Sequence, residues 1–286
     1  MPGIISGLIS MFGWGTSDFL AAKSSRKFGF VLTLFWAQFI GFLLILFYFI
    51  LNFHNFDIRG VIKFIPLIII YSIFATISIL AFFRALTIGE ISLVSPITSS
   101  WAMITVILSV LFLSETLKSY QSIAIFLIII GIILISIDVN QFFRKNRPFF
   151  SAGIKEAFIA MFGFGFAMFL LAILIKSVSW FMPAFLSRLF ISIFLILYAS
   201  SSKHTLIAKI QSGWILILII ASLDVIATFA YSFGVSSVLS SIVAPIAAAS
   251  PLVTTILAQI FLKEKLALNK IFGIIMTILG LILISI

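Results

Sequence analysis

The chain contains no cysteine and only two histidines, and charged residues make up 9% of its 286 residues. The absence of cysteine excludes disulfide bonds and thiolate metal sites. His54 and His204 lie far apart in polar connections, so a histidine-based metal centre is not expected. The scarcity of charge, set against 63% hydrophobic residues, is incompatible with an ordinary soluble domain. We therefore expect neither a metal nor a cofactor.

Sequence motifs typical of enzymes and ATPases are absent as well. The sequence holds no H-E-x-x-H and no G-x-S-x-G, and no histidine falls inside an apolar run, which disfavours an embedded enzyme. It holds no G-x-x-x-x-G-K-[ST] loop, which disfavours an ATP-driven pump. The net charge of +10 comes from basic residues that stand singly or in threes between apolar runs. That distribution is typical of membrane loops facing anionic lipid, so no nucleic-acid partner is expected.

Long apolar runs dominate what is present. Each is continuous rather than alternating and is about 19–25 residues long, enough for a helix to cross roughly 30 Å of hydrocarbon. The first run begins at Ile4 without a preceding basic segment, so no cleavable signal peptide is expected. The expected fold is an all-α, multi-pass integral membrane protein with ten transmembrane helices, near 4–22, 29–51, 62–84, 91–113, 119–137, 154–175, 180–200, 213–234, 237–261 and 267–286.

The chain also repeats itself. MFGWG at 11–15 returns as MFGFG at 161–165, and GIILISI at 131–137 returns as GLILISI at 280–286. This divides it into a first repeat (1–139), a connection (140–153) and a second repeat (154–286). Five spans per repeat is an odd number, so the second copy must enter the membrane from the opposite side. Inverted repeats of this kind are typical of secondary transporters.

Two criteria for orientation disagree. Most lysines and arginines flank odd-numbered connections, and the positive-inside rule then places both termini outside the cytoplasm. The family resemblance described next implies the reverse.

Several doubled features carry that resemblance. The first span has Gly13-Trp14-Gly15; the fourth and ninth spans each have an early proline, followed by a turn with Glu115 or Glu264 and a short glycine-containing helix. In this order the sequence resembles the drug/metabolite transporter superfamily, in its ten-helix EamA branch. The resemblance implies a bundle around a central cavity lined by spans 1, 3, 4, 6, 8 and 9. It also implies both termini in the cytoplasm and outward transport of small metabolites, such as amino acids, across the cell membrane.

Ionisable residues deep in apolar spans are costly, so they are the first candidates for substrate binding. Arg188 and Asp224 lie near the middle of the seventh and eighth spans. They either face a water-accessible cavity or form a structural ion pair. Gln38 is the repeat equivalent of Arg188. Asp18, one turn after Trp14, is either a cavity residue or an interfacial acid close to basic residues.

Trp14, Trp101 and Tyr231 lie within spans rather than at their edges, where an aromatic belt would lie, and with Thr98 they are expected to wall the cavity. Such a wall suits an amphipathic zwitterion or an aromatic metabolite better than a phosphorylated compound, which needs several convergent cations.

Pro96 and Pro245 are repeat equivalents, each in the first half of its span. Proline removes a backbone donor and frees a carbonyl, so the pair forms either a hinge at each gate or two static kinks.

The sequence thus predicts a secondary transporter that exports small metabolites by alternating access between its repeats. A passive channel or facilitator and a lipid scramblase are the alternatives. Expected partners are a small-molecule substrate and the lipid bilayer. Small residues spaced by four, such as Gly3 and Gly7, together with Gly131, Gly273 and Gly280, allow a homodimer face.

Overall fold

The protein is described by a computed structural model covering residues 2–89, 91–136, 152–203, 205–206, 213–262 and 268–285. These ranges form helices and turns and contain no strand. The predicted boundary between the first repeat and the connection, at 139/140, lies outside the described residues, as does the predicted turn with Glu264. In chain order the helices are α1 (Pro2–Phe28), α2 (Phe30–Leu51), the 3₁₀ helix η1 (Phe53–Asn55), α3 (Ile58–Ile62), α4 (Ile65–Ile88), α5 (Ile91–Ser99), α6 (Trp101–Phe112), α7 (Ser119–Ser136), α9 (Ile154–Ser177), α10 (Met182–Ser201), α11 (Trp214–Ser237), α12 (Ser240–Ala248), α13 (Ser250–Leu262) and α14 (Leu268–Ser285).

All the predicted apolar segments fall on these helices. Within the described residues, seven helical stretches are long and apolar enough to cross a membrane, and three more, Ile97–Phe112, Ser119–Ile135 and Leu268–Ile284, are apolar but shorter. The protein is therefore a multi-pass, all-helical membrane protein.

Two predicted spans differ from expectation because each is broken into two helices. The segment 91–113 divides into α5 and α6 at Ser100, and the segment 237–261 divides into α12 and α13 at Ala249. At both breaks the backbone bonds shift to a tighter pattern: the Ser100 amide donates to the Ile97 carbonyl at 3.2 Å, and the Leu252 amide donates to the Ala249 carbonyl at 2.9 Å. The breaks lie at repeat-equivalent positions.

Glycine and proline set several helix ends. Gly29 has φ 90°, a left-handed value that glycine adopts readily, and it separates α1 from α2. Pro66 and Pro183 stand in the first turns of α4 and α10, where a missing amide hydrogen costs nothing.

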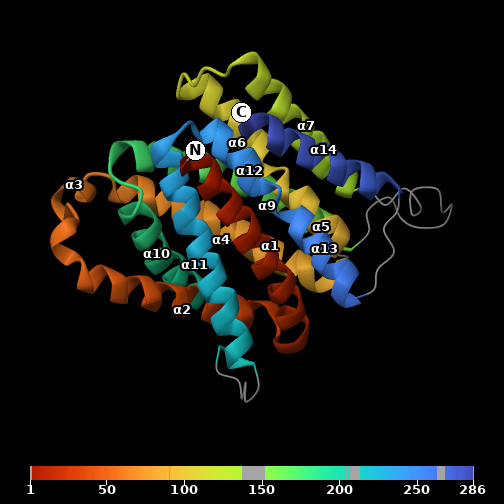
Figure 1. Ribbon diagram of the computed structural model, residues 1–286. Coiled ribbons are helices and arrows are strands. Elements are labelled where there is room, and N and C mark those ends of the chain that lie inside the picture. Colours follow the sequence, from red (N-terminus) through yellow and green to blue (C-terminus); the bar gives the residue numbers. More distant parts are fainter. Residues whose placement is uncertain are drawn as a thin grey trace.

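The two halves of the chain interlock rather than lie side by side. The three most extensive contacts each join a helix of the first half to one of the second: α1 with α11, α7 with α14, and α4 with α9. Figure 1 shows α7 and α14 lying together along one edge of the bundle, and α1 beside α11 through its middle. The centre of the described bundle is consequently formed by helices of both halves.

The repeated MFGWG and MFGFG motifs are explained by this interlocking. A Cβ on Gly15 would lie 2.6 Å from the Ser250 carbonyl oxygen, and one on Gly165 would lie 2.6 Å from the Ile104 side chain. The close approach lets the glycine carbonyls accept hydrogen bonds from the facing helices: Thr254 Oγ1 donates to the Gly15 carbonyl at 2.9 Å and Thr105 Oγ1 donates to the Gly165 carbonyl at 3.1 Å. The motif therefore marks where α1 and α9 approach a neighbouring backbone closely.

Polarity is distributed as a lipid environment requires. Large apolar side chains such as Leu111, Phe112, Ile215 and Phe261 are at least 68% exposed, whereas many serines and threonines are buried. Several of the buried hydroxyls, including those of Ser72 and Thr76, donate to the carbonyl one turn earlier in their own helix. Polar groups in the described part of the chain are thus gathered inside the bundle, where the candidate site lies.

Candidate functional site

Four helices bring one polar side chain each to a common point. Arg188 on α10 forms an ion pair with Asp224 on α11, with Nη2 2.8 Å from Oδ2. Arg188 Nη1 donates to Gln38 Oε1 on α2 at 3.0 Å. Trp14 on α1 donates through its indole N–H to the other Asp224 oxygen at 3.1 Å. Residues far apart in the sequence therefore form one hydrogen-bonded network.

The guanidinium is almost fully enclosed. The Arg188 side chain is 4% exposed and that of Asp224 is 20% exposed. Arg188 Nη2 also donates to Thr228 Oγ1 at 3.0 Å. Space for the guanidinium comes from Gly41 on α2, where a Cβ would lie 2.9 Å from Arg188 Nη1. The charge is buried, but it is paired and hydrogen-bonded, as a low-dielectric site demands.

A cavity of about 120 Å³ opens beside this network. Seven of the predicted binding residues line it: Trp14, Asp18, Gln38, Thr98, Trp101, Arg188 and Asp224. Arg188 and Asp224 form an ion pair and also line the cavity, and their part in substrate binding stays a prediction. Asp18 likewise lines the cavity.

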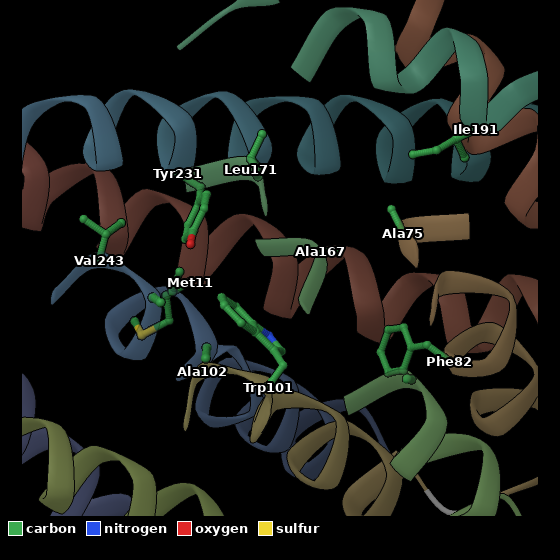
Figure 2. Packing of buried hydrophobic residues seen from close by; sticks show 14 of the residues in the cluster. Met11, Ala75, Phe82, Trp101, Ala102, Ala167, Leu171, Ile191, Tyr231 and Val243 are labelled. Carbon is green, nitrogen blue, oxygen red and sulfur yellow. The ribbon is translucent and has the colours of Figure 1, made fainter. Parts of the chain in front are cut away.

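Tyr231 lies behind the cavity wall instead of in it. Its ring centroid is 5.6 Å from that of Trp14 and 6.1 Å from that of Trp101, and its side chain is fully buried. Figure 2 shows Tyr231 on α11 and Trp101 on α6 reaching toward each other. The tyrosine therefore fixes the two tryptophans that do reach the cavity (Trp14 and Trp101).

The predicted prolines lie one turn before the helix breaks. Pro245 is inside α12, and Ala249 closes that helix by donating to the Pro245 carbonyl at 3.1 Å. Pro96 falls within α5, which ends at Ser99. Pro245 is not among the residues described as lining the cavity, whereas Thr98, Ser99 and Ser250 at the breaks are. The breaks thus supply polar cavity residues, and hinge motion stays a prediction.

A family model described as the EamA-like transporter family matches residues 1–137 and again residues 151–286. The chain belongs to the EamA-like transporter family. Because the model matches each half separately, one family unit is present twice. The resemblance drawn from the doubled motifs is confirmed.

Two further similarities accompany the family match. The chain is 47% identical over 76 residues to "Uncharacterized protein MJ1333.1" of Methanocaldococcus jannaschii; the alignment covers 27% of this chain and 56%, about half, of that relative. A solved crystal structure superposes with a TM-score of 0.75, covering 98% of this chain and 95% of that one at 13% identity. At that identity the superposition establishes the shared fold.

The cavity of this EamA-like chain has residues that sequence reasoning missed. Spans two and seven, which the resemblance did not assign to the cavity, contribute the predicted Gln38 and Arg188 and also three residues that were not predicted, Ala37, Ser187 and Ile191. Thr228 follows Asp224 by one helical turn, a spacing that predicts a shared face. The sequence also did not reveal three aromatic lining residues on α4, because aromatic residues are abundant in the apolar spans and most of them pack helices or face lipid. These residues are Tyr71, Phe82 and Phe83.

A second buried cluster joins the two halves at Glu115, in the turn after α6. Glu115 Oε1 accepts from Lys176 Nζ at 2.5 Å and from Ser240 Oγ at 2.8 Å, and Oε2 accepts from the Ser241 amide at 2.9 Å. The carboxylate thereby caps the first turn of α12. Burial tends to raise the pKa of Glu115, but the hydrogen bonds from Lys176, Ser241 and Ser240 outweigh it and hold the pKa below its usual value.

Within the described ranges, no group of three or more His, Asp or Glu side chains is placed to hold a metal ion.

The ion pair can be tested by a double-mutant cycle on the free energy of unfolding in detergent. Asp224→Asn leaves the Arg188 charge buried without its partner and should cost about 3 kcal/mol. Arg188→Gln combined with Asp224→Asn should recover most of that loss, because neither charge is then unpaired. Arg84→Gln removes a pair whose arginine is 57% exposed and serves as the control, with a change of at most about 1 kcal/mol. Additive losses in the double variant would contradict the pairing.

The Glu115 cluster should make stability depend on pH. A carboxyl with a lowered folded-state pKa stabilises the fold above its ordinary value of 4.5, and this contribution is lost as the pH falls through the folded-state pKa. Glu115→Gln should therefore cost about 1–3 kcal/mol at neutral pH and progressively less below about pH 4.5. Thermal unfolding followed by tryptophan fluorescence across pH measures this. Ser240→Ala, which removes one donor, should give a smaller change of the same sign, and parallel pH profiles for wild type and Glu115→Gln would refute the assignment.

Proposed function

We propose that this EamA-like protein is a secondary transporter that exports small amphipathic metabolites, such as amino acids, across the cell membrane by alternating access. The single observation that carries the proposal is the cavity at the junction of the two halves, whose largely apolar wall includes the Arg188–Asp224 pair. Ionisable groups inside a membrane bundle mark a substrate or ion pathway when they face a cavity.

An inverted repeat is supported by where equivalent residues lie. Gln38 and Arg188 occupy equivalent positions and are hydrogen-bonded to each other, as expected when a two-fold axis passes between them. The cavity is lined by equivalent pairs: Trp14 with Phe164, Asp18 with Met168, Tyr71 with Ile220, Ala75 with Asp224, and Trp101 with Ser250. With five spans in each half, such an axis lies in the membrane plane.

This arrangement supplies two related gates around one site. The helix breaks at Ser100 and Ala249 are repeat-equivalent and border the cavity, so either half can pivot beside the bound substrate. The Glu115 cluster ties the α6–α7 turn of the first half to the start of α12 in the second. In alternating access, one end of the bundle is closed while helices at the other end move apart. The Glu115 cluster would hold one end closed, and the helix breaks would allow the movement.

The chemistry of the wall favours small organic substrates over phosphorylated ones. Arg188 is the one cation among the described residues that line the cavity, and Asp224 already neutralises it. A phosphate group needs several convergent donors of positive charge.

Topology tests the ten-span inverted arrangement, and the absence of native cysteine makes single-cysteine labelling clean. Cysteines at Pro2 and after Ile286 should react with a membrane-impermeant maleimide from the same side of the membrane. A cysteine at Asn146, in the predicted connection, should react only from the other side. Labelling of Asn146 from the same side as either end would rule out the odd number of spans.

Transport tests the function itself. Purified protein in liposomes loaded with unlabelled phenylalanine, leucine or threonine should take up the same labelled amino acid with saturation and trans-stimulation. Trp101→Leu, in the cavity wall, should reduce this counterflow at least about tenfold if it removes a hot-spot contact. Phe112→Leu, 69% exposed on the outer face, is the matched control and should retain it. Uptake that is linear in concentration and insensitive to internal substrate would favour the channel alternative.

A further inference from the structure

The charges around the cavity do not balance. Among the described residues that line it, Asp18 and Asp224 are acidic and Arg188 is basic, which leaves one negative charge in excess when both acids are ionised. Asp18 comes from α1 in the first half and Asp224 from α11 in the second, and both line the cavity. No cation in the described part of the chain contacts Asp18. An excess charge in a low-dielectric space favours binding of a positive ion.

The charge of Arg188 is already paired within the protein. Both of its terminal nitrogens donate, to Gln38, Asp224 and Thr228, and its Nε is buried without a hydrogen-bond partner among the described residues. A substrate carboxylate would have to displace Asp224 from a 2.8 Å ion pair and leave that acid unpaired. The one positive group at the cavity is therefore already occupied by the protein itself.

The rest of the wall suits an ammonium group. The indole rings of Trp14 and Trp101 meet edge to face, with centroids 6.3 Å apart, and both line the cavity together with Phe82, Phe83 and Phe164. Aromatic faces attract cations. Thr98 is 4% exposed and lines the cavity, and its hydroxyl has no hydrogen-bond partner. The Thr98 hydroxyl therefore has an unused capacity to accept a hydrogen bond at the cavity wall.

We propose that the cavity binds a primary organic ammonium ion with an apolar or aromatic body, and that Asp18 is the carboxylate that receives the ammonium while Thr98 accepts one of its hydrogens. On this proposal a free carboxylate on the ligand weakens binding, so amines are preferred to amino acids. The inference rests on the proposed function for the location of the site, and narrows its substrate class.

A headgroup series on one phenyl body tests the preference. The ligands are phenethylammonium, 2-phenylethanol, phenylalanine and 3-phenylpropionate, titrated calorimetrically into the purified full-length protein in detergent at neutral pH. Phenethylammonium should bind at least about tenfold more tightly than each of the others, as a charge-assisted hydrogen bond in a buried site provides. Equal affinities across the series, tightest binding of 3-phenylpropionate, or no binding by any member would each overturn the proposal.

Variants then assign the preference to Asp18. Asp18→Asn should reduce the affinity for phenethylammonium to that for 2-phenylethanol and leave the alcohol unchanged. Asp18→Glu, which keeps the charge, should retain a preference for the amine, and it serves as the second variant if Asp18→Asn is not recovered folded. Asp57→Asn, which alters an acid that caps α3 outside the cavity, is the control and should bind like the wild type. An amine preference that survives in Asp18→Asn would overturn the assignment.

The two proposals can fail separately. If amino acids show saturable, trans-stimulated transport but binding shows no preference for the amine, the transporter proposal stands and the ammonium-site proposal is wrong. If amine binding depends on Asp18 but no member of the series shows saturable transport, the ammonium-site proposal stands and the transporter proposal is wrong.

Discussion

A guanidinium ion within a lipid-embedded bundle has to be provided with its counter-charge by the protein, and here the counter-charge comes from a neighbouring helix. Arg188 on α10 is held by Asp224 on α11 and by Gln38 on α2, and Trp14 on α1 holds the other oxygen of the same aspartate. Four helices are thereby fixed around one pair of charges. Leaving either charge unpaired in this environment costs several kcal/mol, so the relative placement of these helices depends on the pair.

The cavity combines matched positions with unmatched chemistry. Its wall is built from equivalent positions of the two halves, but the residues at these positions differ. Asp18 in the first half corresponds to Met168 in the second, and Asp224 in the second half corresponds to Ala75 in the first. The glycines and threonines that set the helix spacing, by contrast, are kept in both halves, as with Gly15 and Thr254 against Gly165 and Thr105. Duplication has thus preserved the residues that determine the packing, while the residues that face the cavity differ between the copies.

The sequence predicted the fold class because long apolar runs and a doubled motif order are strong signals in a membrane chain. The sequence identified Arg188 and Asp224 as candidate binding residues because ionisable groups deep in apolar spans are rare. It left the side that Asp18 faces open, since nearness to Lys23 along the chain says nothing of which way a helix face is turned. It missed Tyr71, Ala37, Ser187 and Ile191 for the same reason. The helix breaks were expected at the prolines, but they occur one turn later, where the backbone donors and acceptors can be satisfied in tighter turns.

The Glu115 cluster has a consequence for how one end of the bundle can come apart. A single carboxylate from the first half accepts hydrogen bonds from the Ser240 hydroxyl, the Ser241 amide and the Lys176 ammonium of the second half. If the two segments separate, all of these donors lose the same acceptor together, and Ser240 also loses its hydrogen bond to Ser109 of the first half. Parting at this end therefore breaks several hydrogen bonds to one buried carboxylate in a single step, which makes the separation cooperative.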